Sequence, residues 1–235
     1  MSAWSDGLDE KVRQCRSNEC TMGLLHRATE SLGFDFFLYA TRASTPFVNP
    51  DTKVIGTFPA NSSVHYLDAI QREERSLSHL NARVSCFFVW RDSIKGANRK
   101  LFDEFWGYGL RHGCVLTVRN FNNASHSFSV ARRGNLVSSK EASDLKSKLK
   151  HLIEIFAEST AFQCAGGRDA QRILFTDRER QILQWSAEGK SSAEVGIILD
   201  ICPDTVNFHL NNIKRKLGVS NKTSAVAYAV AMGLV

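Results

Sequence analysis

The chain has 235 residues, a formal net charge of +6 and a pI of about 9.1, and 43% of its residues are hydrophobic. This length can bury a substantial core in one large or two smaller domains. The positive charge permits attraction to a polyanion but does not establish it. The sequence has no apolar run of about 18 residues and no secretory signal, so we expect a cytoplasmic protein without a membrane span.

Six cysteines are scattered along the chain without a C-x-x-C pair or a histidine at zinc-ligand spacing. We therefore expect free thiols, no metal site and no disulfide framework: Cys15, Cys20, Cys86, Cys114, Cys164 and Cys202. The sequence also lacks a G-x-S-x-G elbow, an H-E-x-x-H pair and a glycine-rich phosphate loop, so we do not expect an enzyme.

Residues 1–162 mix helical and strand-like segments. A helical opening runs to about residue 32, and aromatic or β-branched runs predict strands at 34–41, 53–58, 86–90, 113–119 and 125–133. Helical periodicity marks 65–80, 98–113 and 140–162. The pattern predicts an α+β fold, in which an antiparallel sheet carries helices on both faces as an α-β-α sandwich.

Residues 163–173 include the polar, glycine-containing stretch "QCAGGRDAQ" and are predicted to be a linker. Residues 174–235 are then predicted to form an all-α domain of four helices. Two capping boxes, Thr176 with Glu179 and Ser191 with Glu194, start the first two helices, which end near 188 and 199. Pro203 suits the first turn of a third helix, and a fourth starts near 222.

The third helix has one narrow apolar stripe and an amide-rich, cationic outer side, which suits a recognition helix in the DNA major groove. We expect Asn207 and Asn211 to read bases. Lys214 and Arg215 are either phosphate anchors or a solvated face, and Phe208 either meets a thymine methyl group or packs on protein. The complete set of predicted DNA-binding residues is Lys190, Ser191, Thr205, Asn207, Phe208, Asn211, Lys214 and Arg215.

The stretch from "FTDRERQILQW" through "GKSSAEVG", "TVNFH" and "KLGVSNK" resembles the helix-turn-helix domain of LuxR-type quorum-sensing transcription factors. Upstream, "LGFDFFLYATR", "GTFPANSSVHY" and "YGLRHGCVLTVR" resemble the autoinducer-binding domain of the same family. The resemblance implies a homodimer that binds a palindromic promoter site on double-stranded DNA. It also implies a regulatory domain that normally folds around an acyl-homoserine lactone.

The resemblance places the lactone-anchoring positions of the family at Phe58, Ser62, Tyr66, Arg75, Trp90 and Ser129. Tyr66 and Trp90 keep the family residues, and Ser129 matches a position that can reach the amide of the signal. Phe58 stands where the family has a tyrosine, Ser62 where it has a tryptophan and Arg75 where it has an aspartate. Arg75 cannot accept the hydrogen bond that the aspartate accepts, because a guanidinium has donors only.

We therefore expect that this regulator needs no acyl-homoserine lactone and no other cofactor to fold and act. Arg75 would either pair with a nearby acid or extend to water, leaving a cavity closed by aromatic side chains such as Phe58, Phe87 and Phe88. Three alternatives stay open. A one-residue shift that puts Glu74 at the acidic position would restore lactone binding, a different small molecule could bind, or the protein could inhibit another LuxR-type regulator by forming mixed dimers.

Overall fold

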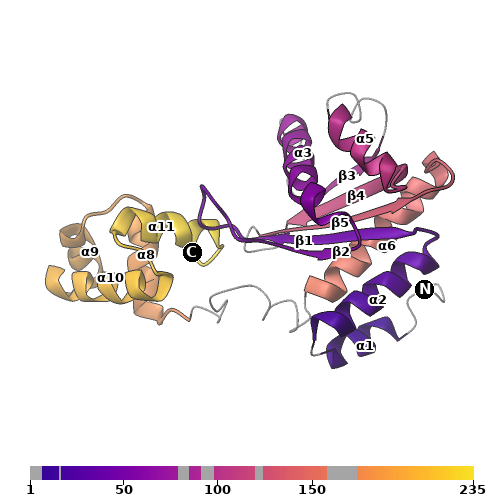
Figure 1. The fold of residues 1–235 in the computed structure, drawn as a ribbon. Coiled ribbons are helices and arrows are strands. Elements are labelled where there is room, and N and C mark those ends of the chain that lie inside the picture. The colour runs from indigo at the N-terminus through magenta and orange to yellow at the C-terminus, as the bar shows by residue number, and fades with distance from the viewer. Residues whose placement is uncertain (1–6, 16, 79–84, 91–97, 120–123, 158–173) are drawn as a thin grey trace. The chain divides into compact units, whose positions relative to one another are not determined.

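The computed structural model describes residues 7–15, 17–78, 85–90, 98–119, 124–157 and 174–235 (Figure 1). These residues form two compact units, a mixed α/β unit and a second unit that contains the last four helices together with residues 43–51. In the described part of the chain, no helix combines the length and the apolar character that a membrane span needs. The predicted linker at 163–173 lies outside the described residues.

The first unit is built on a five-stranded sheet in which every neighbouring pair is antiparallel. The strand order across the sheet is β2-β1-β5-β4-β3. The strands are β1 (Phe36–Arg42), β2 (Thr52–Gly56), β3 (Ser85–Val89), β4 (His112–Arg119) and β5 (Ser125–Arg132). Each predicted strand is present within three residues of its expected bounds.

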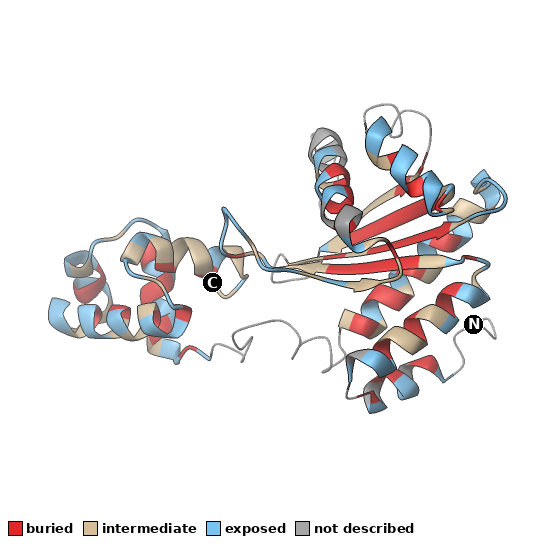
Figure 2. Ribbon diagram, viewed as in Figure 1, coloured by how far each residue is buried: buried red, intermediate tan, exposed pale blue. Residues whose placement is uncertain are grey.

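Helices cover both faces of the sheet, which confirms the predicted sandwich (Figure 1). One face packs against α2 (Asn18–Ser31) and α6 (Ser139–Ala157), and α1 (Leu8–Gln14) packs against these two helices. The other face packs against α3 (Ala60–Ser78) and α5 (Arg99–Gly107). The buried residues lie along the sheet and on the helix sides that face it (Figure 2).

Side-chain alternation along β5 explains the two separate cores. Phe128 and Val130 belong to the core under α2 and α6, whereas Ala131 belongs to the core under α3 and α5. The hydroxyl of Ser129, which is 0% exposed, reaches Tyr66 of α3. The sheet therefore presents a hydroxyl group to the α3 side at the centre of the unit.

Two sequence predictions in the first unit are wrong. The helix expected over 98–113 ends at Gly107, because Gly109 adopts a φ of +88° and the chain turns into β4. Cys15 and Cys20, expected to be free thiols, form a disulfide. The reason is local: only three residues separate α1 from α2, and their connection brings the two Cα atoms to 5.7 Å.

The second unit contains α8 (Asp177–Ala187), α9 (Ser192–Leu199), α10 (Pro203–Leu217) and α11 (Lys222–Ala231). Both predicted capping boxes are present, with Thr176 and Ser191 as the N-cap residues. Pro203 occupies the first turn of α10, and Gly218 ends that helix with a φ of +67°. These local signals set the helix bounds. The capping residues pair backbone groups that a helix end leaves unpaired, and Pro203 has no N–H that would need a partner.

Glu179 connects the start of α8 to the end of α10. Its carboxylate is 3% exposed, accepts a hydrogen bond from the Thr176 amide at 2.8 Å and pairs with the Lys216 ammonium at 2.6 Å. Burial raises the pKa of Glu179, but the hydrogen bonds from Lys216 and Thr176 lower it more, so the net pKa is below the usual glutamate value. The ionised carboxylate therefore stabilises the folded unit.

We predict that Glu179→Gln lowers the free energy of unfolding of the second unit by about 1–3 kcal/mol at pH 7, because the buried charge-assisted bonds are lost. The pKa of Glu179 is depressed in the folded state, so its contribution is present above the unfolded-state pKa and is lost as the pH falls through the folded-state value. Urea unfolding of the full chain at pH 7 and pH 4 measures both effects. The exposed Glu188→Gln variant is the control, and an equal loss in both variants would contradict the assignment.

Candidate nucleic-acid interface and sensor core

The second unit contains a tight helix-turn-helix formed by α9 and α10. Residues 200–202 connect the two helices, and Asp200 adopts a left-handed φ of 53°. The Ile201 amide donates to the Gly196 carbonyl at 2.9 Å. A Cβ atom at Gly196 would lie 2.7 Å from the Ile201 carbonyl oxygen, so the close turn requires glycine at this position.

The α10 helix is amphipathic, as its sequence predicts. Its buried stripe is Val206, Leu210, Ile213 and Leu217. Asn207, Asn211 and Arg215 lie on the surface. Phe208 is 62% exposed. A polar helix face next to a short preceding helix has the geometry of a recognition helix.

Several of the predicted DNA-binding side chains already have partners inside the unit. The Asn207 carbonyl oxygen accepts from the Ser192 hydroxyl at 2.8 Å, which fixes this side chain against α9. The Ser191 hydroxyl caps α9, and the Lys190 ammonium lies 3.8 Å from Glu194. The Thr205 hydroxyl lies 3.0 Å from the Cys202 sulfur. Asn207 therefore presents its amide in a fixed orientation, and Asn211 is exposed one turn further along α10.

The sensor core of the first unit is a chain of buried hydrogen bonds among Trp90, Tyr66 and Ser129. The Trp90 indole N–H donates to the Tyr66 hydroxyl at 3.2 Å, and that hydroxyl donates to the Ser129 hydroxyl at 3.1 Å. All three side chains are at most 3% exposed. Three of the six predicted pocket residues are thus brought together and hydrogen-bond to one another.

Aromatic rings enclose this sensor core. The Phe58 ring centroid lies 5.5 Å from Tyr66 and 6.1 Å from Trp90, and Phe102 and Phe105 of α5 complete the cluster. Phe88 joins the same core, as expected. Phe87 was expected there as well, but it packs against the core on the opposite face, because successive side chains of β3 alternate.

Ser62 and Arg75, the remaining predicted pocket positions, lie on α3, but their side chains are outside the described residues. Glu74, the alternative acid, has the same status. The sequence nevertheless gives the residue types at the two positions. Ser62 has a short hydroxyl side chain where the family resemblance implies a tryptophan, and Arg75 has a guanidinium where it implies an aspartate.

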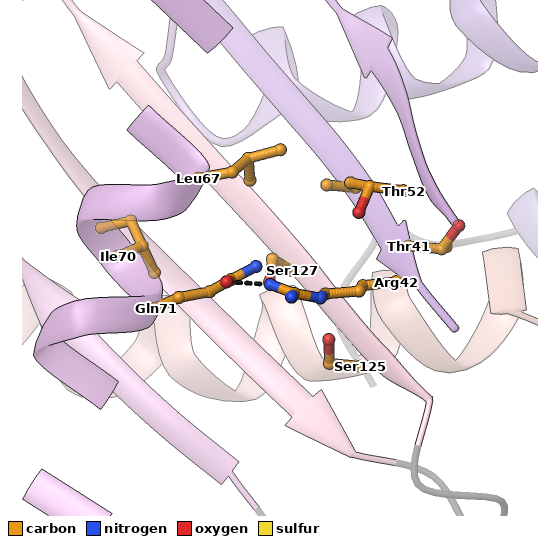
Figure 3. A pocket seen from close by; sticks show the side chains of 9 residues that line it. Thr41, Arg42, Thr52, Leu67, Ile70, Gln71, Ser125 and Ser127 are labelled. Carbon is orange, nitrogen blue, oxygen red and sulfur yellow. Dashed lines mark hydrogen bonds between the residues drawn. The ribbon is translucent and has the colours of Figure 1, made fainter. Parts of the chain in front are cut away.

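A small polar pocket lies beside the sensor core and was missed by sequence reasoning (Figure 3). It is formed by the ends of β1, β2 and β5 together with α3, and in Figure 3 the Arg42 and Gln71 side chains meet across it. The sequence did carry one signal for it. The alternating serines at 125, 127 and 129 place hydroxyls on one face of β5, but only the strand register shows that Arg42 lies beside them.

The helix-turn-helix and the separate sheet-based unit with its enclosed sensor core define a DNA-binding regulator with a sensory domain. Residues 174–229 match the family described as "Bacterial regulatory proteins, luxR family", and residues 17–159 match the "Autoinducer binding domain". The chain belongs to the LuxR family of quorum-sensing transcriptional regulators.

Individual relatives are similar to this chain over most of its length. The chain is 36% identical to the HTH-type quorum-sensing regulator RhlR of Pseudomonas aeruginosa, over 99% of this chain and 96% of that protein. It is 33% identical to the transcriptional activator protein PhzR of Pseudomonas fluorescens, over 89% and 86%. A crystal structure of Escherichia coli SdiA has the same fold, with a TM-score of 0.77 at 24% identity over 99% and 98% of the chains.

We predict that Tyr66→Phe destabilises the first unit by about 1–3 kcal/mol, because it leaves the buried Trp90 N–H and the Ser129 hydroxyl without this partner. Chemical unfolding monitored by tryptophan fluorescence measures the loss. The matched control is Tyr108→Phe, which removes a hydroxyl from a side chain that is 56% exposed. If the two variants unfold alike, the Tyr66 hydroxyl does not support the core.

We predict that Asn211→Ala weakens binding to a selected DNA site by about 1–3 kcal/mol, or about 5- to 140-fold in Kd, because the expected bidentate base contact would be lost. Binding to random duplex should change little. Fluorescence anisotropy with both duplexes measures the difference, and Asn135→Ala in the first unit is the control. Equal weakening on both duplexes would instead assign Asn211 to phosphate contact.

Proposed function

We propose that this LuxR-type regulator folds and binds DNA as a homodimer without an acyl-homoserine lactone. The observation that carries the proposal is the buried hydrogen-bond chain of the sensor core. Tyr66, Trp90 and Ser129 satisfy one another, so these groups need no ligand to avoid an unpaired buried state. The fold is then stable without the signal.

The replaced positions support the same proposal. Phe58 has no hydroxyl, Ser62 has no indole N–H, and Arg75 inverts the charge of the acceptor that the family resemblance implies. A missing hydrogen-bond partner in a binding site costs on the order of 1–3 kcal/mol, so three such changes remove several orders of magnitude of affinity. Lactone binding is therefore weak even where the cavity can open.

A second line of support is the ligand bound by a protein of this fold. One solved structure is described as SdiA in complex with octanoyl-rac-glycerol, a molecule without a lactone ring. A sensory domain of this architecture is thus not restricted to lactones. For this chain, we infer that loss of the lactone anchors changes the ligand requirement but leaves the regulator functional.

DNA binding in this proposal uses two copies of the second unit on the two halves of a palindromic site. The exposed side of α10 enters the major groove, with Asn207 and Asn211 at base edges. Lys190, Ser191 and Thr205 lie near the N-termini of α9 and α10, where phosphate contacts are favoured. Lys214 and Arg215 add positive charge in the last turn of α10.

We predict that protein expressed without any lactone is soluble, melts cooperatively and shows the same melting midpoint with every lactone tested. The triple variant Phe58→Tyr, Ser62→Trp, Arg75→Asp restores the anchors implied by the family and serves as the positive control. At a lactone concentration of about 100 times Kd, the melting midpoint of this triple variant should rise by roughly 5–10 °C. The proposal fails if the unmodified protein is insoluble without lactone, or if one lactone raises its midpoint by several degrees.

A gel-shift assay separates direct DNA binding from action through mixed dimers. Duplexes selected from a random pool by the purified protein alone should share a palindromic sequence, and binding should weaken as the salt concentration rises. If no sequence is selected alone but the protein removes another LuxR-type regulator from its DNA site, the mixed-dimer alternative holds.

A further inference from the structure

The polar pocket beside the sensor core contains an arginine whose donors are only partly used. Its lining is Ala40, Thr41, Arg42, Thr52, Leu67, Ile70, Gln71, Ser125 and Ser127. The strand register explains the polarity, because Thr52 and Ser125 lie directly opposite Arg42 on its two sides. Residues paired across neighbouring strands point to the same face, so a guanidinium and two hydroxyls gather at one end of the sheet.

The Arg42 guanidinium donates a hydrogen bond to the Gln71 carbonyl oxygen of α3. Among the described side chains, no carboxylate lies within ion-pair distance of it. A guanidinium has five N–H donors in a planar fork that matches the two oxygens of a carboxylate. A half-buried cation with an uncharged partner is a good site for an anion, since burial strengthens the attraction.

The size of the pocket limits what can enter. Its volume is about 20 Å³, and a single water molecule needs roughly 10–15 Å³. One small, flat group therefore fits, and the rest of a ligand must lie at the open mouth. A carboxylate satisfies this limit, while its oxygens can accept from Arg42 and from the Ser125 and Thr52 hydroxyls.

We propose that this pocket binds the carboxylate group of a small organic acid through Arg42. The ligand would join α3, which carries Gln71 and Tyr66, to the ends of β1, β2 and β5. The inference rests on the proposed loss of the lactone requirement, because it gives the same sensory domain a chemically different ligand. It is tested by direct binding, so its outcome does not depend on lactone response or on DNA binding.

The test uses sodium propionate and the full chain, with binding measured by saturation-transfer NMR and by the melting midpoint. Sodium chloride at equal ionic strength, neutral propionamide and sodium phosphate are the comparison solutes. We expect saturable propionate binding with a Kd on the order of 1 mM. Propionate has only five non-hydrogen atoms, and the binding free energy that a ligand can gain is limited by its number of such atoms. We expect no comparable binding of propionamide or phosphate, and no matching rise of the midpoint in chloride.

Variants locate the site. Arg42→Gln should weaken propionate binding by about 10-fold or more, because the charge-assisted fork is lost. Arg42→Lys keeps the charge but not the fork, so its loss should be intermediate, and it serves as the test if the glutamine variant does not melt cooperatively. Arg99→Gln, at a side chain that is 85% exposed, is the matched control and should bind as the wild type does.

Four results would overturn the assignment. They are undetectable propionate binding, equal binding of propionamide or phosphate, the same rise of the midpoint in chloride, and unchanged affinity in both Arg42 variants. A lactone response of the unmodified protein would contradict the proposed function instead. The two proposals can therefore fail separately.

Discussion

The core of the first unit depends on the hydrogen bonds of the Tyr66 hydroxyl. It links α3 to Trp90, which directly follows β3, and to Ser129 of β5, so one buried group joins a helix to two strands. Burying a hydroxyl without a partner costs free energy, and here two partners remove that cost. The rings of Phe58, Phe102 and Phe105 then pack against a core whose polar groups are already satisfied.

The same group of residues connects stability to sensing. In a regulator whose buried polar groups are paired only when a ligand binds, ligand binding stabilises the folded state by mass action. In this chain Tyr66, Trp90 and Ser129 hydrogen-bond to one another, and the proposed separation of folding from the signal rests on these bonds. Further along this sheet face, where the strands end, Arg42, Thr52 and Ser125 line the small polar pocket.

Sequence reasoning succeeded where the signal was local. The capping boxes at Thr176 and Ser191, the proline that begins α10 and the glycine that ends it lie within a few residues of the backbone groups they affect. The sandwich followed from strand and helix periodicity. The bond between Tyr66 and Ser129 spans 63 positions, so no local pattern could reveal it.

Three other misses have related causes. Arg42 becomes a pocket residue only through its register with Thr52 and Ser125 on separate strands, which the sequence does not specify. The Cys15–Cys20 disulfide depends on the path of the connection between α1 and α2. In the second unit, sequence identified the polar side of α10 but not that Ser192 already holds Asn207. Side-chain pairing of this kind needs the packed geometry of two helices.

Lys216 illustrates how an internal ion pair changes the electrostatics of a DNA-binding helix. The last turn of α10 carries Lys214, Arg215 and Lys216, yet the Lys216 ammonium binds Glu179 and the Leu174 carbonyl. A cation neutralised within the protein displaces no condensed counterion from DNA. Each chain therefore contributes one fewer released ion than its sequence suggests, and the affinity for DNA falls less steeply with salt concentration by about 0.9 in the log–log slope per chain.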